Sequence, residues 1–222
     1  MPRLTSEICE FFVGLDLGQS RDHSALAVVE RADVFTGIDP VTYERRRRRR
    51  YRLRFLERVR LGTPYPAVVD RVAEVVRRPA LSGRCMLVMD ATGVGAPVLD
   101  LLRAAGLGCA VTPVILTAGD GAFLGGRVWR VPKRDLISGL QLMLEKEELG
   151  LPARLAAARV LARELAAVEE RVGSAPRTLL RYGAWREEAH DDLVIAAALA
   201  CWRARWKSPP VWGAGSLGLG YT

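Results

Sequence analysis

The feature that most constrains the fold is the segment Cys85–Asp90 (CMLVMD), an apolar run that ends in an aspartate and shows almost no alternation of apolar and polar residues. A strand with one face in water alternates, whereas a strand buried on both faces does not. A Gly-rich turn, a predicted helix over 96–105 and a second apolar strand over 109–116 follow it. This strand, helix, strand order predicts a parallel crossover, and therefore an α/β fold with a central sheet.

The N-terminal part of the chain predicts antiparallel strands. Apolar runs over 11–16 and 24–31 flank the polar segment LGQSRDH, a pattern typical of two strands joined by a hairpin connection. The segment 51–60 alternates basic with apolar residues over much of its length, as a third strand with one face in water would. Six consecutive arginines, 45–50, cannot enter a core, so we predict a solvated turn there. This turn is either a solubilising loop tip or an arm that contacts phosphates.

The rest of the chain predicts mainly helices. Residues 66–78 carry valines at helical spacing, and Pro79 lies just beyond them. The segment 117–130 is Gly-rich and non-periodic, so we predict a mobile loop. We expect a single domain over residues 1–207 and a flexible C-terminal tail over 208–222. Further helices are predicted over 133–148, 155–171 and 188–205.

Cysteine and histidine usage limits the kind of metal site. The cysteines stand singly with no C-x-x-C pair, so neither a zinc site nor a disulfide framework is predicted, and we interpret them as buried small hydrophobes. Because the chain has only 2 histidines, any metal must be held mainly by carboxylates, which suits Mg²⁺ or Mn²⁺. The cysteines are Cys9, Cys85, Cys109 and Cys201.

Charge and hydropathy bear on partners and location. The formal net charge of +8 is compatible with a polyanionic partner such as nucleic acid, although many basic proteins have none. The sequence has no uninterrupted apolar run of about 18 residues, and its N-terminus lacks a basic stretch followed by an apolar core. We therefore expect a cytoplasmic protein, in the host cytoplasm if it is viral.

Acidic residues lie where apolar segments meet loops. Asp16 closes the first strand, Asp90 closes the buried strand, and Asp191 and Asp192 open the last helix. Converging carboxylates repel one another unless a cation lies between them, so this placement predicts a divalent-metal site. Each residue also has a structural interpretation, because Asp191 or Asp192 could cap the helix and the other two could stabilise turns.

Four segments carry a family resemblance. In order they are GLDLGQSRDHSALAVVE, LVMDATGVGAPVLDLLRAAG, VPKRDLISGLQLMLEKEELGLP and HDDLVIAAALACW. They resemble the nuclease domain of the large terminase subunits of tailed bacteriophages, which belongs to the ribonuclease H, integrase and resolvase superfamily. The resemblance spans residues 10–205. It implies a ribonuclease H-like mixed sheet, with the first three strands antiparallel and the central strands parallel, flanked by helices.

The resemblance also implies a function. It predicts a two-metal-ion endodeoxyribonuclease with two Mg²⁺ or Mn²⁺ ions, which cuts concatemeric viral DNA during genome packaging. Its catalytic and metal-binding carboxylates would be Asp16, Asp90 and Asp191, with Asp192 sharing or taking the third role. Double-stranded DNA is the implied substrate, and a packaging ATPase domain and portal are the implied partners. The sequence contains no G-x-x-x-x-G-K-[ST] motif, so it has no motor of its own.

Supporting residues are open to two interpretations. His190 either assists a metal or the scissile phosphate, or only opens the helix, and Lys133 either contacts substrate phosphate or is a solvated helix-start residue. Asp22 either tunes the metal site or stabilises the first turn, and both roles stay open. For Ser24 we favour the turn role. The candidate DNA-binding residues are Arg45, Arg46, Arg47, Arg48, Arg49, Arg50, Arg127 and Arg130.

Three other functions compete with this one. A Holliday-junction resolvase-like nuclease would share the strand-end carboxylates and the basic surface. A catalytically inactive DNA-binding module would use its aspartates only in turns. An actin-like sugar kinase also has D-x-G near its N-terminus, but this chain is too short for two such lobes.

Overall fold

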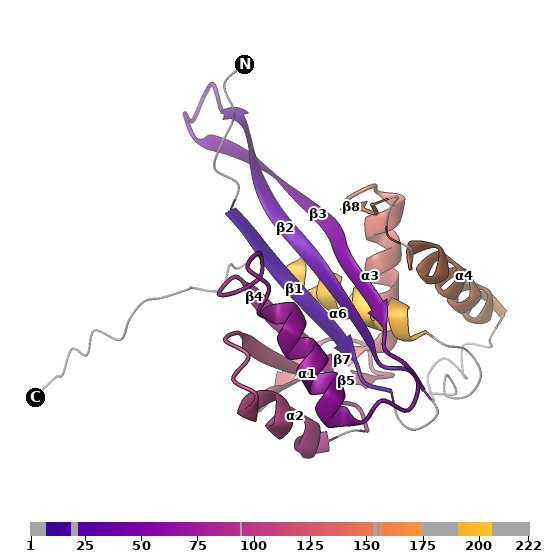
Figure 1. The fold of residues 1–222 in the computed structure, drawn as a ribbon. Helices are drawn as coiled ribbons and strands as arrows, with labels where there is room; N and C mark the ends of the chain where they lie inside the picture. Colours follow the sequence, from indigo (N-terminus) through magenta and orange to yellow (C-terminus); the bar gives the residue numbers. More distant parts are fainter. Residues whose placement is uncertain are drawn as a thin grey trace, which may run out of the picture.

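The fold is built on one eight-stranded sheet (Figure 1). A computed structural model describes residues 8–18, 22–93, 95–152, 155, 157–174 and 191–205. The strand order across the sheet is β6-β7-β5-β4-β1-β2-β3-β8. The strands are β1 (Ile8–Asp16), β2 (Ala25–Ile38), β3 (Arg45–Arg58), β4 (Cys85–Asp90), β5 (Ala110–Thr117), β6 (Phe123–Gly125), β7 (Val128–Pro132) and β8 (Leu149–Gly150).

The sheet is mixed, as predicted. Strands β1, β2 and β3 pair antiparallel, whereas β1, β4, β5 and β7 run parallel to one another. The predicted mixed sheet, with antiparallel first strands and parallel central strands flanked by helices, is therefore confirmed. Its consequence is that β1, β4, β5 and β7 all end at one edge of the sheet, where β2 begins and β3 ends. We call this the carboxyl edge.

Helices cover both faces. Helices α1 (Tyr65–Val76) and α2 (Gly95–Ala104) pack on one face, and α3 (Lys133–Glu145), α4 (Ala158–Ser174) and α6 (Asp192–Ala204) pack on the other (Figure 1). The five valines predicted to form the buried stripe of α1 are all buried. Among the described residues, no helix combines the length and apolarity needed to cross a membrane.

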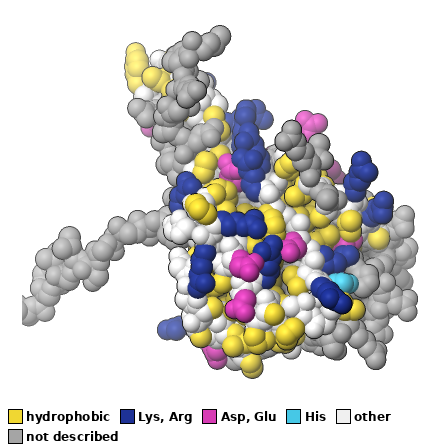
Figure 2. All heavy atoms as spheres, in the orientation of Figure 1, with side chains coloured by type: hydrophobic (Ala, Val, Ile, Leu, Met, Phe, Trp, Pro, Cys, Tyr) yellow, Lys and Arg dark blue, Asp and Glu magenta, His cyan; other side chains and the backbone are white. Residues whose placement is uncertain are grey.

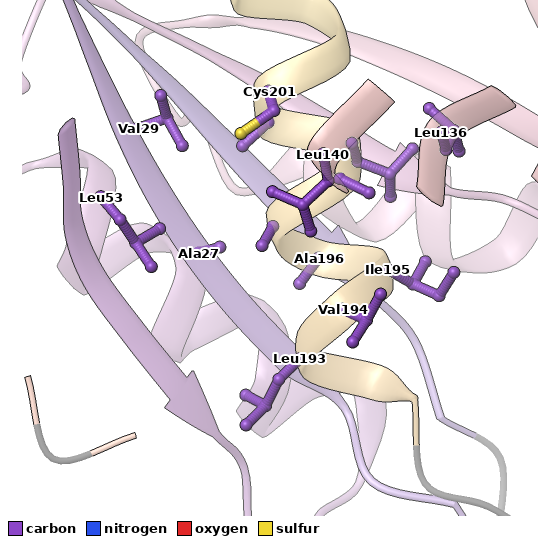
Figure 3. Close-up of a cluster of buried hydrophobic side chains, with 14 of the residues drawn as sticks. Ala27, Val29, Leu53, Leu136, Leu140, Leu193, Val194, Ile195, Ala196 and Cys201 are labelled. Carbon is purple, nitrogen blue, oxygen red and sulfur yellow. The ribbon is translucent and has the colours of Figure 1, made fainter. Parts of the chain in front are cut away.

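Helix α6 is the most deeply buried element on its face. Its stretch from Leu193 to Cys201 is at most 2% exposed, because it lies between the sheet and α3 (Figure 3). Small residues permit this close approach: Ala27 faces α6 from β2, and a Cβ on Gly14 of β1 would lie 1.9 Å from the Ala196 carbonyl oxygen. Side chains alternate along a strand, so Gly14 and Asp16 point to the same face. Asp16 therefore faces α6.

The turn predicted for the six arginines is wrong, because residues 45–50 form the first part of β3. Strands β2 and β3 continue to pair beyond the start of β1, up to Ile38 opposite Arg45 (Figure 1). The reversal is made instead by residues 39–44, where Asp39 Oδ1 accepts hydrogen bonds from the Val41 and Thr42 amides. A ribbon with both faces in water can carry charges on alternate sides without losing its backbone pairing. We call this projecting part the β2–β3 ribbon.

The predicted mobile loop over 117–130 is also partly wrong. It contains the β6–β7 hairpin, whose turn includes Gly126 at φ +67°, and Trp129 of β7 packs against Trp202 of α6. A hairpin this short has too little sequence for a strand period to be recognised.

The predicted ends of the helices after β7 shift by several residues. Helix α3 ends before Lys146, α4 begins later than expected, and α6 begins at Asp192, whereas residues 188–190 lie outside the described part. The tail over 208–222 also lies outside it. Of the cysteines, Cys85 and Cys201 are buried as expected, whereas Cys9 and Cys109 are only partly so.

Candidate functional site

The carboxyl edge brings the predicted aspartates toward one place. Asp16 ends β1 and Asp90 ends β4, the strand that pairs with it in parallel. Asp191 directly precedes α6, which begins at the same edge and packs on the face to which Asp16 points. All three are partly exposed, whereas Asp192 is only 5% exposed. Three separate elements therefore present carboxylates at one edge. We call these four residues the acidic cluster.

The carboxylates of the acidic cluster act on one another electrostatically. The pKa of Asp16 is raised well above its usual value, first by burial and then by the negative charges of the other three, while Lys133 opposes the rise. Burial is also the main cause of the raised pKa of Asp90, and hydrogen bonds from Thr92 and the charge of Lys133 oppose it. Like charges raise one another's pKa only when they are close, so the four form a single electrostatic unit.

Lys133 is the cation of this unit. Strand β7 ends at the carboxyl edge, and the next residue, Lys133, begins α3 and places its Nζ 2.7 Å from Asp191 Oδ2. Asp191 occupies the N-cap position of α6 but makes no capping hydrogen bond with its side chain. Helix capping therefore does not explain Asp191, and a solvated helix start does not explain Lys133. Both side chains are turned toward the acidic cluster.

Asp192 faces a different neighbourhood. Its Oδ2 lies 3.3 Å from Arg58 Nε at the end of β3, and Arg58 also forms an ion pair with Glu164 of α4. Glu164 Oε2 accepts a hydrogen bond of 3.2 Å from the Leu193 amide, so α4 caps the start of α6. Burial raises the pKa of Glu164 to about 7, with Arg58 lowering it and Asp192 raising it. These contacts fix the helix end that presents Asp191.

Asp90 is held by a local turn as well. Its Oδ1 accepts a 2.7 Å hydrogen bond from the Thr92 amide, and the Thr92 hydroxyl accepts one of 2.8 Å from the Leu116 amide of β5. Gly93 follows with φ +80°, a conformation that L side chains rarely adopt. The turn interpretation of Asp90 is thus correct, and the same turn orients the carboxylate at the carboxyl edge.

The first hairpin connection explains the D-x-G and D-x-S spacings. A Cβ on Gly18 would lie 2.2 Å from the Asp22 carbonyl oxygen, so only glycine fits there. The Gly18 amide donates to Ser24 Oγ at 3.2 Å, which confirms the turn role favoured for Ser24. His23 Nδ1 donates to the Val59 carbonyl at 2.9 Å and joins this connection to the end of β3. The side chain of Asp22 is exposed, and its role stays a prediction.

Other predicted residues lie apart from the acidic cluster. The six arginines are at the opposite end of β3 from Arg58. Arg127 directly precedes β7 and is six residues from Lys133, which directly follows it, or about 20 Å in extended chain. The guanidinium of Arg130 lies 5.9 Å from the Phe123 ring centre. His190 lies outside the described residues.

Two site residues were missed by sequence reasoning. Arg58 was counted only as part of an alternating strand, and Glu164 lies in a helix whose polar face carries no motif. Only the three-dimensional contact between β3, α4 and α6 identifies them.

The acidic cluster fits a divalent cation by its chemistry. Oxygen-only ligands are those that Mg²⁺ and Mn²⁺ prefer, and burial next to other carboxylates disfavours the charged form of Asp16 without a cation. Over the described ranges, no three His, Cys, Asp or Glu side chains already lie in the arrangement of a formed metal site. Instead the ammonium group of Lys133 supplies the positive charge.

Comparison with known proteins gives a similarity to a solved structure. A scan of protein-family models and a search of curated proteins found no match. The chain is similar to the crystal structure of the large terminase nuclease from thermophilic phage G20c, with 20% sequence identity and a TM-score of 0.47. The similarity covers 87% of this chain and 81% of that one.

Proposed function

We propose that this chain is a metal-dependent endonuclease that hydrolyses phosphodiester bonds of double-stranded DNA. The observation that carries the proposal is the acidic cluster. Asp16, Asp90 and Asp191 come from a strand end, a neighbouring parallel strand end and a helix start, and one lysine compensates their charge. Carboxylates gathered at strand ends suit a metal site that must also admit a large substrate, because the edge of the sheet is open to solvent.

The acidic cluster would hold Mg²⁺ or Mn²⁺ through Asp16, Asp90 and Asp191. Asp192 is engaged by Arg58, which favours Asp191 as the third ligand. The chemistry that two such cations supply when bound is activation of water for attack on phosphorus and stabilisation of the departing oxygen.

The protein's own residues position this chemistry. The Thr92 amide orients Asp90, and Glu164 holds the start of α6 so that Asp191 stays beside Asp16. Lys133 neutralises Asp191 in the absence of cations. With cations bound, its ammonium group would be available to contact a substrate phosphate, which is one of the two roles that the sequence leaves open for Lys133.

The biological setting that we propose is cleavage of concatemeric viral DNA during genome packaging. Its support is the order of the four sequence segments that resemble terminase nucleases, each of which contains a residue of the acidic cluster or Lys133. A packaging ATPase and a portal are the partners this setting would require. Because the sequence has no P-loop motif, the motor would be a separate domain or protein.

The test is cleavage of supercoiled plasmid with Mn²⁺, Mg²⁺ or EDTA. We expect metal-dependent nicking or linearisation by the wild type, and a loss of at least about 100-fold for Asp16→Asn and Asp90→Asn. Asp70→Asn is the matched control, because Asp70 is an exposed aspartate on α1 outside the acidic cluster. Folded Asp16→Asn and Asp90→Asn proteins that cut at the wild-type rate would refute the proposal. Absence of cutting by the wild type would favour the inactive DNA-binding module.

A further inference from the structure

The β2–β3 ribbon carries arginines on both of its faces. Side chains alternate along β3, so Arg48, Arg50 and Arg52 share the face on which α1 packs further along the sheet. All three are exposed, and Figure 2 shows basic side chains following the projecting ribbon on this face. We call these three residues the arginine row.

The arginine row differs in its ion pairs from Arg46, which precedes it on the same face, and from Arg49 on the other face. Arg46 pairs with Asp39 at 2.6 Å and Arg49 with Asp33 at 3.1 Å, so each neutralises an acid of its own ribbon. Within the described residues, no ion pair engages a member of the arginine row.

The nearest acid on this face is already paired. Glu30 lies on β2 opposite Arg52, but its carboxylate pairs with Arg54. Together with Ala32, Val34, Arg50 and Arg52 it lines a shallow depression. The row therefore presents uncompensated cations beside a small apolar surface.

We infer that the arginine row is a binding surface for the phosphate backbone of double-stranded DNA, separate from the acidic cluster. Its charges recur about every 6.6 Å along the strand, and each strand of a duplex carries one phosphate about every 3.4 Å, so successive arginines meet roughly every second phosphate. Arginine also suits phosphate because its planar guanidinium donates two parallel hydrogen bonds.

The row lies far from the acidic cluster along the strand. Arg52 and Arg48 are six and ten residues from Arg58 on β3, which corresponds to about 20 and 33 Å. The row would therefore hold DNA about 6 to 10 base pairs from the carboxyl edge, at 3.4 Å per base pair. This inference rests on the proposed function for its choice of substrate, but not on cleavage.

A competing explanation is that the arginines only protect an exposed strand edge from pairing with another molecule. Among the described residues, β3 is paired on its outer side only at Tyr51 and Arg52, with β8. Charged residues commonly protect such unpaired edges. That role depends on charge anywhere along the edge, so it does not distinguish the row from Arg46 and Arg49. The two explanations therefore predict different results for matched variants.

The experiment measures binding of a 30-base-pair DNA duplex by fluorescence anisotropy in EDTA at several salt concentrations. The variant Arg48→Ala/Arg50→Ala is compared with Arg46→Ala/Arg49→Ala, which removes the same number of charges from the same strand. If the row contacts two phosphates through these residues, the salt slope of log K should fall by about 1.8 in the first variant. It should change by less than half as much in the second.

The binding slopes of the two variants decide whether the arginine row contacts DNA. Equal slopes in the two variants, or no loss in the first, would overturn it, and self-association of both variants with unchanged DNA binding would support edge protection instead. Stronger binding of the wild type to anionic phospholipid vesicles than to DNA would also overturn it. Because EDTA prevents metal-dependent cutting, a negative result here leaves the nuclease proposal standing, and an inactive nuclease would leave the DNA-binding surface standing.

Discussion

The contact between Gly14 and α6 gives a prediction that links packing to the site. In Gly14→Ala, the new Cβ would lie 1.9 Å from the Ala196 carbonyl oxygen and 3.0 Å from the Ala200 amide nitrogen. Real Cβ atoms keep at least about 3.0 Å from backbone atoms, so strand and helix must separate by about 1.1 Å. The atoms concerned are backbone on both elements, and no flexible side chain can absorb the shift.

The magnitude follows from this displacement. Overpacking of a closely packed core costs about 1 to 3 kcal/mol, and a clash against helix backbone belongs at the upper end of that range. Because Asp191 is the N-cap residue directly before α6, moving the helix also moves this carboxylate relative to Asp16. A misplacement of about 1 Å can cost about 100-fold in rate, so metal-dependent cleavage should fall by more than the loss of stability explains.

The assay is urea unfolding of Gly14→Ala together with its plasmid cleavage rate under conditions where the protein is folded. The matched control is Gly139→Ala on α3, where the Cβ would meet only Arg205 Nη1 at 3.7 Å. This control should be neutral or up to about 1 kcal/mol more stable, because alanine favours helix over glycine. A Gly14→Ala protein as stable and as active as the wild type would refute the close packing of α6 on β1.

Three further predictions concern the charges. Asp16→Asn removes a carboxylate whose pKa is raised in the fold, so the melting temperature of the metal-free protein should rise. Thermal unfolding of this variant should also show no stabilisation by Mn²⁺, and an unchanged response to Mn²⁺ would contradict the prediction. The pKa of Glu164 is about 7 in the fold and ordinarily 4.5, so the stability that its protonated form contributes is fully present below about pH 4.5 and is lost as the pH rises through 7. Glu164→Gln should remove up to about 3 kcal/mol of this decline in the free energy of unfolding. Parallel pH profiles of unfolding for the variant and the wild type would refute this. Lys133→Met should destabilise the metal-free protein by about 1 to 3 kcal/mol, because it removes the cation paired with Asp191. It should also enlarge the shift in melting temperature that Mn²⁺ induces. An unchanged shift would show that Lys133 does not oppose cation binding.

Local patterns predicted the parts of the fold that depend on neighbouring residues. The absence of alternation in Cys85–Asp90 indicated a central parallel strand, and the valine spacing of α1 indicated its buried face; both are confirmed. The arginine run was wrongly predicted to be a turn. Charge opposes burial but does not prevent strand pairing, and residues 45–50 pair with β2 in a part of the sheet that carries no core. Sequence carries no local signal for that pairing.

The candidate site was predictable only as a set of positions. The ends of β1 and β4 and the start of α6 identified the positions of the acidic cluster, because these ends meet at the carboxyl edge. The contacts between its members depend on how helices from distant parts of the chain pack. Lys133 reaches Asp191 because α3 and α6 pack together, and Glu164 caps α6 only because α4 lies beside it. No spacing in the sequence records these distances.

A metal site at the acidic cluster is best tested by anomalous X-ray diffraction from crystals of the protein soaked in Mn²⁺. We predict manganese peaks bounded by Asp16, Asp90 and Asp191, with Lys133 Nζ moved away from its 2.7 Å contact with Asp191, and no such peaks in Asp90→Asn crystals. Crystals in which Lys133 stays bound to Asp191 and no manganese lies among these carboxylates, at millimolar Mn²⁺, would contradict this prediction.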